Sequence, residues 1–340
     1  MNNKKKFYGV NDSNWGHKWG YKDSGFIINE DMSVTFTGNR YPICGKRLPN
    51  FIPFVEEVLG VRFDKKPKIQ EVEKTHVTES RVNKPFLEEL RKSFEENRFT
   101  FEHNERVLHS HGQHSTDEVY KVLYNKLEKF TDLVFYIESE EETKKLIDLA
   151  KKHNVCLIPY GGGTNVTNAL RPPKEESRMV VSVDTRRMNK IETLDEENLM
   201  VVVQAGITGK ALEDGLNKRG FTVGHEPDSY EFSTVGGWVS TNAAGMKKHK
   251  YGNIEDIVQN ITMVTPVGIV NQKRPLTRSS FGIKAQNILF GSEGNLGIIT
   301  SATLKIHRLP EKSAYESIIF SDWETGVQFM HDLFHSNMVP

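Results

Sequence analysis

The 340 residues carry 45 basic and 45 acidic side chains, so the formal net charge is zero. A balanced charge provides no long-range field that would gather nucleic acid, and we expect no nucleic-acid partner. With 37% hydrophobic residues the chain can bury a substantial core, and its length suggests two domains. No apolar stretch reaches the roughly 18 residues of a membrane span, although peripheral membrane contact stays open. The cysteines, Cys44 and Cys156, cannot make a disulfide framework and fit a reducing compartment.

The first part of the chain, residues 1–126, is rich in charged and aromatic residues, and we expect a mostly helical accessory region. Alternating side chains predict a β-hairpin over residues 26–37, and apolar residues at helical spacing predict a helix over residues 117–130. The basic run at residues 4–6 is interpreted as a solvated terminus.

Three histidines in this region, His109, His111 and His114, have a spacing that occurs in zinc sites. No nearby set of Cys or Asp residues completes four ligands. We therefore expect solvent-facing or locally bonded histidines and no metal site.

From residue 127 to residue 309 the pattern alternates between strands and helices, which is typical of an α+β domain. Ser139 and Glu142 form a capping-box pattern at the start of the first helix. The expected elements are strands at residues 133–137, 155–159, 179–183 and 199–205, and helices at residues 140–153 and 210–219. The first strand, the first helix and the second strand predict a βαβ unit.

The last part of the chain, residues 310–340, contains a predicted helix over residues 323–337. Trp323, Val327 and Phe334 lie on one face of this helix, and we expect that face to be buried. We therefore expect residues 310–340 to begin a second domain that is cut off or abbreviated.

The glycine triplet at residues 161–163 directly follows an apolar strand. No lysine follows at the spacing of an NTPase phosphate loop, and Val166 occupies the third-glycine position of a Rossmann fingerprint. Asp184 is interpreted as the end of a strand. What remains is a loop whose main-chain N–H groups approach a pyrophosphate, with Thr164 and Asn165 as side-chain donors. A glycine triplet alone is more often only a tight turn.

Further stretches favour a nucleotide site over a plain turn. Residues 227–245 combine small residues, paired glycines and several hydroxyl side chains around Trp238. Residues 291–300 carry three glycines at spacings of three directly before an expected strand. Together with the glycine triplet and residues 250–258, they form a strong joint signal.

At residues 159–165, 228–234, 241–244 and 293–299 the sequence resembles the FAD-contacting segments of flavoproteins of the vanillyl-alcohol oxidase type. The run GHEPDSYEFSTVGGWVSTNAAGMKKHKYGNIEDIV is very similar to the alkylglycerone-phosphate synthase family, also called alkyldihydroxyacetonephosphate synthases. The resemblance continues upstream in WGHKWGYKDS, ICGKRLP and HSHG, and covers nearly the whole chain.

This resemblance implies an α+β fold in which residues 127–309 form an FAD-binding domain of two α+β subdomains. Residues 1–126 would precede it as the accessory region, and residues 310–340 would begin a truncated cap domain. The cofactor would be non-covalent FAD. The residues expected to hold it are Pro159, Tyr160, Gly161, Gly162, Gly163, Thr164, Asn165, Asp228, Ser229, Tyr230, Glu231, Phe232, Ser233, Thr234, Thr241, Asn242, Ala243, Ala244, Glu293, Gly294, Asn295, Leu296, Gly297, Ile298 and Ile299.

The implied activity is a transferase reaction of ether-lipid biosynthesis. The acyl group of acyl-dihydroxyacetone phosphate would be exchanged for a long-chain fatty alcohol through a flavin–substrate adduct, without net oxidation. The resemblance also implies a homodimer and a peroxisomal location, although no targeting signal is recognised. The family's arginine, tyrosine and adjacent histidines have no match here, so we assign no catalytic residue. We expect that the 340 residues alone do not complete a turnover.

Two other functions stay open. The same scaffold could serve an FAD-dependent dehydrogenase or oxidase of a 2-hydroxy acid such as D-lactate, or a non-catalytic FAD-binding fragment. Among single residues, His225 is expected in a turn, Trp238 in core packing, and Cys156 as a small hydrophobic residue. The lysines at residues 247, 248 and 250 fit an exposed basic turn or a contact with a substrate phosphate.

Overall fold

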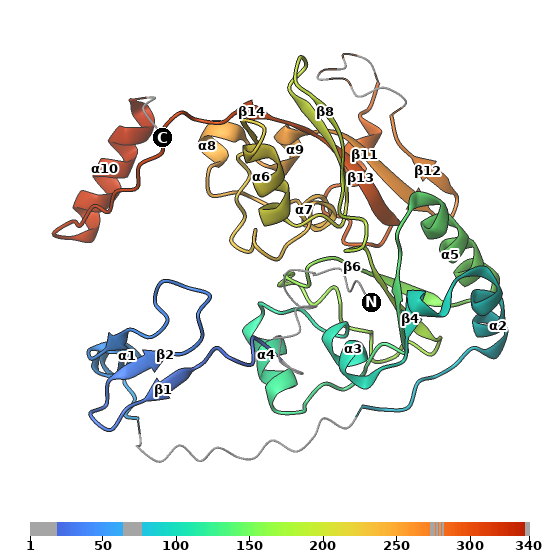
Figure 1. The fold of residues 1–340 in the computed structure, drawn as a ribbon, viewed down its shortest axis with the longest axis horizontal. Helices are drawn as coiled ribbons and strands as arrows, with labels where there is room; N and C mark the ends of the chain where they lie inside the picture. The colour runs from blue at the N-terminus through green and yellow to red at the C-terminus, as the bar shows by residue number, and fades with distance from the viewer. Residues whose placement is uncertain are drawn as a thin grey trace.

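The structure is a computed structural model that describes residues 19–63, 77–272, 276, 278, 280 and 282–336. The basic run at residues 4–6, the start of the WGHKWGYKDS segment and residue 337 lie outside the described residues. The chain forms a two-part body, with a small N-terminal module on one side and a C-terminal helix standing apart on the same side (Figure 1).

The N-terminal module contains the predicted hairpin. Strands β1 (Phe26–Ile28) and β2 (Val34–Phe36) pair antiparallel with Phe26 opposite Phe36, so the hairpin prediction is confirmed. Strand β3 (Arg47–Leu48) extends this sheet, and helix α1 (Phe51–Leu59) follows.

The first subdomain of the body is built on a four-stranded sheet in the order β4-β5-β7-β6. Strands β5 (Leu133–Tyr136) and β6 (Cys156–Tyr160) both run parallel to β7 (Val180–Asp184), which lies between them. Helix α5 (Glu140–Lys152) connects β5 to β6, so the predicted βαβ unit is confirmed, with a third strand inserted. Strand β4 (Phe99–Thr100) pairs antiparallel with β5.

Four short helices accompany this sheet. They are α2 (Lys84–Ser93), η1 (Glu96–Arg98), α3 (His103–Leu108) and α4 (Thr116–Leu123). The helix predicted over residues 117–130 is too long, because Asn125 adopts a left-handed φ of 55° just after Leu123. Two of the apolar side chains on which this prediction is based, Val122 and Phe130, are nevertheless buried, in one small hydrophobic cluster with Val107.

The predicted capping box of α5 forms only by half. The Ser139 hydroxyl accepts the main-chain N–H of Glu142 at 3.1 Å. The Glu142 carboxylate, however, accepts the N–H of Glu138 at 2.9 Å and pairs with Arg98. The ion pair with Arg98 thus competes with the second capping bond.

The second subdomain contains a five-stranded antiparallel sheet in the order β12-β11-β13-β9-β8. A turn at residues 196–199 joins β8 to β9. The strands are β8 (Ile191–Asp195), β9 (Met200–Gln204), β11 (Val258–Thr265), β12 (Gly268–Val270) and β13 (Ile298–Lys305). The remaining elements are α6 (Gly209–Asn217), β10 (Phe221–Thr222), α7 (Val235–Thr241), α8 (Lys248–Tyr251), α9 (Ile254–Ile257), η2 (Ala285–Ile288) and β14 (His307–Arg308).

Each subdomain has its own hydrophobic core, and the two cores meet at helix α5. The first core gathers side chains of α2, α5 and the four-stranded sheet, and the second surrounds the fully buried Trp238. Val264 of β11 and Ile298 of β13 belong to the first core, because α5 contacts both strands. This contact fixes the two subdomains relative to each other.

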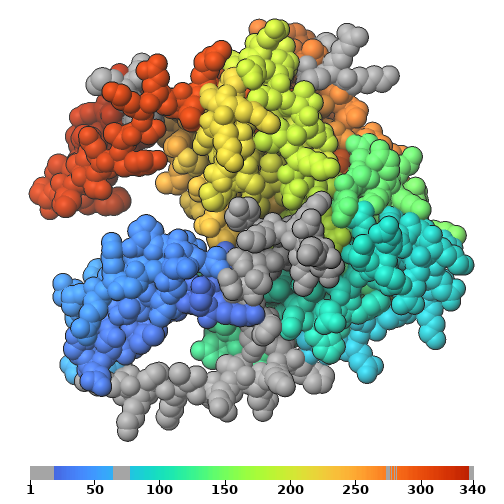
Figure 2. All heavy atoms as spheres, viewed as in Figure 1, coloured from blue at the N-terminus to red at the C-terminus, as the bar shows by residue number. Residues whose placement is uncertain are grey.

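Helix α10 (Trp323–His335) projects from the body, as the ribbon and the space-filling view agree (Figure 2). Trp323 is 81% exposed, and no residue of the helix is buried. Among the described residues, therefore, the expectation that the apolar face of α10 is buried is not met. The helix contacts the body through Phe334, whose ring lies tilted at 45° against that of His249, with 4.3 Å between the ring centroids.

Candidate functional site

A cavity of about 470 Å³ lies between the two subdomains, which is within the usual size range of ligand pockets. The end of β6, helix α7 and the loop before β13 form its walls. The sequence-predicted residues that line it are Pro159, Tyr160, Gly161, Gly162, Gly163, Thr164, Asn165, Asp228, Ser229, Ser233, Thr234, Thr241, Asn242, Ala243, Ala244, Glu293, Gly294, Gly297, Ile298 and Ile299.

Five predicted residues do not line this cavity. Tyr230, Glu231 and Phe232 lie outside its wall, and Asn295 and Leu296 line a neighbouring hollow instead. The structure thus brings all four predicted segments together but separates these five side chains from the cavity surface.

The glycine triplet packs directly against the segment before α7. A Cβ on Gly162 would overlap the carbonyl group of Phe232, and a Cβ on Gly161 would overlap the hydroxyl of Thr234. These positions therefore need glycine because another main chain approaches them.

The main-chain N–H groups of residues 161–164 donate to no acceptor within the described part of the chain. Four successive free donors at a cavity wall are unusual, since most main-chain N–H groups that lose contact with water are paired. Among the described residues no Lys or Arg lines the cavity, so an anionic ligand would rely on these N–H groups and on nearby hydroxyls.

Several residues around the cavity hold left-handed backbone conformations. Asn168, Asn242 and Glu293 have φ values of 62°, 49° and 45°, although none is glycine. Gly163 and Gly294 have φ values of 72° and 83°. Unfavourable backbone geometry concentrates at functional sites, where the surrounding structure holds it in place.

Hydrogen bonds connect the three walls. Glu293 donates its main-chain N–H to the carbonyl oxygen of Ser240 at 2.9 Å, and its carboxylate accepts the Thr167 hydroxyl at 3.1 Å. A Cβ on Gly294 would lie 2.8 Å from Pro159 Cδ. The loop before β13 is thus fixed to α7 and to the glycine loop.

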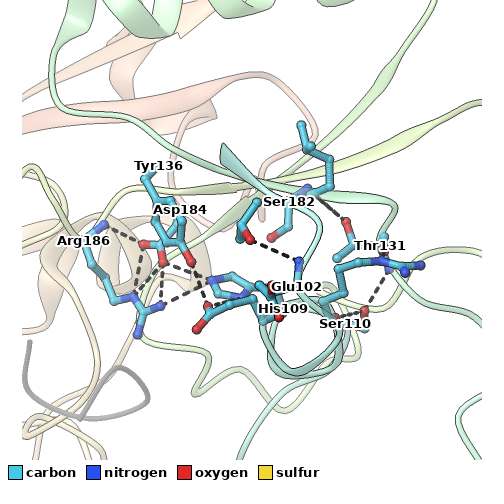
Figure 3. A network of polar contacts seen from close by, with 12 residues as sticks. Glu102, His109, Ser110, Thr131, Tyr136, Ser182, Asp184 and Arg186 are labelled. Carbon is cyan, nitrogen blue, oxygen red and sulfur yellow. Dashed lines mark hydrogen bonds and ion pairs between the residues drawn. The ribbon is translucent and has the colours of Figure 1, made fainter. Parts of the chain in front are cut away.

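A network of buried polar side chains lies next to the residue that precedes the glycine triplet (Figure 3). The Arg186 guanidinium donates to both carboxylate oxygens of Asp184, at 3.0 Å from Nε to Oδ1 and 2.5 Å from a terminal nitrogen to Oδ2. His109 Nε2 lies 3.0 Å from Asp184 Oδ2, and its Nδ1 lies 2.7 Å from the carbonyl oxygen of Glu105. The His109 ring contacts the Tyr160 ring in a tilted arrangement, with 4.4 Å between the ring centroids, so the network contacts the residue that precedes the triplet.

This network keeps Asp184 ionised. Burial alone would raise the pKa of Asp184, but the Arg186 guanidinium and His109 hold it well below its ordinary value. Burial raises the pKa of Tyr160. Asp184 ends strand β7 as predicted, but its ion pair with Arg186 had no signal in the sequence beyond their spacing of two residues.

Of the two alternatives expected for the histidines, solvent-facing or locally bonded, the second holds for His109 and His111, which are both buried and have local hydrogen-bond partners. Local bonding is correct for His111, whose Nδ1 lies 2.7 Å from the carbonyl oxygen of Gly112. Burial lowers the pKa of His111 to about 4, so this ring is neutral at pH 7. Within the described residues no group of three or more His, Cys, Asp or Glu side chains could hold a metal ion.

His225 is more than a turn residue. It is buried, with its ring edge-on to that of Trp238 at 4.9 Å between centroids, and neither ring nitrogen has a hydrogen-bond partner in the described part of the chain. Burial lowers its pKa to about 4. Trp238 is core, as predicted, and donates its indole N–H to Ser233 at 2.8 Å, whereas Cys156 is half-buried in β6.

Sequence reasoning missed other residues of the cavity wall. His114 lines the cavity, and burial lowers its pKa although Asp228 opposes this shift. The paired glycines that begin α7 were noticed in the sequence but not assigned. The missed residues are His114, Val166, Thr167, Ala169, Leu170, Thr185, Pro227, Gly236, Gly237, Trp238 and Ser240.

The cavity fits an extended nucleotide such as FAD in three respects. Free N–H donors at residues 161–164 suit a diphosphate, and apolar surface around Ile298 suits an aromatic ring system. The glycines at residues 161 and 162 let the loop pack directly against Phe232 and Thr234, which holds the free N–H groups at the cavity wall.

Comparison with known proteins agrees with this assignment. Residues 131–272 match the family model described as "FAD binding domain". The chain is 43% identical over 317 residues to the alkyldihydroxyacetonephosphate synthase of Caenorhabditis elegans, covering 93% of this chain and 52% of the relative. The chain is 34% identical over 324 residues to the alkyldihydroxyacetonephosphate synthase of Trypanosoma brucei brucei, covering 92% of this chain and 52% of that relative.

A solved structure of an alkyldihydroxyacetonephosphate synthase matches with a TM-score of 0.83 and 31% identity, over 96% of this chain and 59% of that chain. Over more than nine tenths of its length the chain is similar to alkyldihydroxyacetonephosphate synthases. Its fold is that of the vanillyl-alcohol oxidase type, and FAD is its cofactor. It spans about half the length of the curated relatives that it matches.

A mitochondrial D-lactate dehydrogenase (cytochrome) of Kluyveromyces lactis is 33% identical over 188 residues, which is 55% of this chain and 32% of that protein. This likeness covers much less of the chain than the likeness to the synthases. In the described residues no helix has both the length and the apolar composition to cross a bilayer.

Proposed function

We propose that this chain is the FAD-binding part of an alkyldihydroxyacetonephosphate synthase, a transferase of ether-lipid biosynthesis. It would exchange the acyl group of acyl-dihydroxyacetone phosphate for a long-chain fatty alcohol. The observation that carries this proposal is the row of free N–H donors at residues 161–164 in a cavity whose four segments match the synthases.

The cofactor would lie non-covalently across the cavity. We propose that residues 161–164 bind its diphosphate, and that Asp228, Ser229 and Thr234 lie beneath the flavin ring. The flavin would supply an electrophilic ring nitrogen for the exchange. The protein's own contribution is orientation, because three walls joined through Glu293 and Ser240 hold the ligand in one place.

We propose the domain limits that follow from this assignment, with the FAD-binding domain at residues 127–309 between an accessory region and the start of a cap domain. We also propose a homodimer and a peroxisomal location, both from the resemblance to this family, and, separately from that resemblance, peripheral membrane contact. Light scattering on the purified protein, imaging of a tagged chain in its own cells, and flotation with vesicles test these three proposals.

The flavin spectrum separates the proposed function from a dehydrogenase. With excess D-lactate, the FAD-loaded protein should keep the spectrum of oxidised flavin, because the synthase reaction has no net oxidation. Bleaching by D-lactate or another 2-hydroxy acid would instead support an oxidoreductase. The likeness to the D-lactate dehydrogenase makes this the necessary comparison.

Alkyl transfer is tested with the protein purified from its own cells. Labelled hexadecanol and acyl-dihydroxyacetone phosphate should yield a labelled ether product, and the fatty acid should be released in equal amount. FAD binding without this product and without reduction by a 2-hydroxy acid would mean a non-catalytic FAD-binding protein.

A further inference from the structure

A buried carboxyl group without a partner lies behind the glycine loop. Glu118 of helix α4 is fully buried, and both of its carboxylate oxygens lack a hydrogen-bond partner among the described residues. The nitrogen and the oxygen of the Asn165 side-chain amide are also buried and also lack a hydrogen-bond partner among the described residues. Helix α4 belongs to the accessory region and lies outside residues 131–272, which match the FAD-binding family model.

Glu118 and Asn165 lie beside each other. A Cβ on Gly112 would be 2.6 Å from Glu118 Oε2 and 2.8 Å from Asn165 Oδ1, so both oxygens border the same point. Asn165 also lines the cavity. A second contact fixes this region, because Gln113 donates its main-chain N–H to the carbonyl oxygen of Gly163 at 2.6 Å.

Two oxygens that face each other in a buried position repel unless one of them carries a proton. If Glu118 is a carboxylic acid, its O–H can donate to Asn165 Oδ1. The amide nitrogen of Asn165, with its two N–H donors, then remains for a ligand in the cavity that Asn165 lines. A diphosphate needs donors at this position, next to the free N–H groups of residues 161–164.

We propose that Glu118 is a positioning residue of the FAD site, which holds Asn165 through a carboxylic O–H so that the Asn165 amide donates to the FAD diphosphate. This inference rests on the proposed placement of FAD in the cavity. It extends the site to helix α4.

Burial favours the protonated form of Glu118 and outweighs the N–H of Gly112 and the positive charges of Arg171 and Lys121, which lower its pKa. Lys121 and Arg171 both pair with Asp117, at 2.7 Å and 3.3 Å. The nearby His111 is neutral at pH 7, because its pKa is lowered to about 4. Burial raises the pKa of Glu118, and a bound diphosphate would disfavour its anion further.

The test compares three variants of the 340-residue chain by FAD titration of the apoprotein, with flavin fluorescence as the signal. Glu118→Ala should raise the Kd for FAD about tenfold, the effect of losing one well-placed hydrogen bond to a charged group. Glu118→Gln should keep a Kd near that of the wild type, because its amide can also donate to Asn165. Tyr120→Phe, an exposed and uncharged neighbour on the same helix, is the matched control and should leave the Kd unchanged.

The pH dependence of the Kd for FAD distinguishes a proton-donating role of Glu118 from a merely structural role, which would not change with pH. The wild-type Kd should rise with pH as Glu118 loses its proton, since the anion cannot donate to Asn165. Glu118→Gln has no proton to lose and should show no such rise. If the variant keeps the wild-type pH profile, Glu118 is not the titrating donor and the proposal fails.

A double-mutant cycle with Asn165→Ala decides whether the two residues act together. In the Asn165→Ala background, Glu118→Ala should have no further effect on the Kd. An unchanged Kd in Glu118→Ala alone, with a raised Kd in Asn165→Ala, would overturn the role of Glu118 but keep the FAD placement. Unchanged values in Asn165→Ala and in Gly162→Ala would instead overturn the placement itself.

The melting temperature of each variant apoprotein, compared with that of the wild type, shows whether the variant has a folding defect. If Glu118→Ala does not fold, Glu118→Gln and Asn165→Ala still decide the question. A tenfold loss of affinity in Glu118→Gln would contradict the donor role.

Discussion

At the residue scale, the closest approach in the site is between Gly162 and the carbonyl group of Phe232. Replacement of Gly162 by Ala should push these two segments apart and misplace the free N–H donors. We expect the Kd for FAD to rise at least about tenfold, because several hydrogen bonds to the diphosphate weaken together. Isothermal titration of the apoprotein measures this.

Gly25 provides the control for that variant. A Cβ there would meet only Thr37 Oγ1, at 4.0 Å, and the residue lies in the N-terminal module. Gly25→Ala should bind FAD like the wild type. Equal affinity of Gly162→Ala and Gly25→Ala would mean that the glycine loop does not bind the cofactor.

The ion pair between Asp184 and Arg186 predicts a large effect on stability. Asp184→Ala would leave the Arg186 guanidinium buried without a counter-charge, which should lower the free energy of unfolding by about 3–5 kcal/mol. Asp214→Ala, in the exposed pair with Lys210, should change it by less than about 1 kcal/mol. Urea unfolding measures the free energy of unfolding of both variants. Equal losses would contradict the larger contribution to stability proposed for the buried pair.

The same residue predicts the acid response. The pKa of Asp184 in the folded state lies below its ordinary value of 3.8. Its contribution to stability is therefore complete above pH 3.8 and is lost as the pH falls through the folded pKa. Asp184→Ala should lose stability less steeply than the wild type in this acid range, and an unchanged slope would contradict the assignment.

At the element scale, the cap of helix α5 is a local and separable feature. The Ser139 hydroxyl accepts the N–H of Glu142, so Ser139→Ala should lower the free energy of unfolding by about 1 kcal/mol. Ser115 precedes α4 but makes no side-chain cap bond. Ser115→Ala should therefore have little effect, and thermal unfolding of both variants checks the difference.

Elements with strong local patterns could be predicted from the sequence. The β1–β2 hairpin and the β5–α5–β6 unit follow from alternation, helical spacing and a capping serine, all of which act within a few residues. The end of α4 could not be predicted, because it depends on the left-handed backbone of Asn125. Strand β8 was missed, because its half-exposed side chains show little apolar pattern.

The candidate site was predictable where glycines marked close approach of two chains. The triplet and the loop at Gly294 both meet other segments, and both were found in the sequence. The supporting groups were not found, since His109, Asp184 and Arg186 come together only through the fold. Glu118 was missed for the same reason, because a buried carboxyl group has no local sequence signal.

At the scale of the whole molecule, the cavity lies between two subdomains with separate cores. A ligand that contacts both walls stabilises their arrangement as well as each wall. The order of the four segments along the chain was visible in the sequence, but their meeting at one cavity required the two sheets to be positioned by α5.

The most direct test of this account is FAD titration of the purified apoprotein, followed by absorbance and by thermal unfolding. We expect one FAD per chain, an oxidised flavin spectrum, and a stabilisation of about 2.7 kcal/mol when free FAD is 100 times the Kd. A polypeptide that stays colourless in excess FAD, with an unchanged melting temperature, would contradict the account.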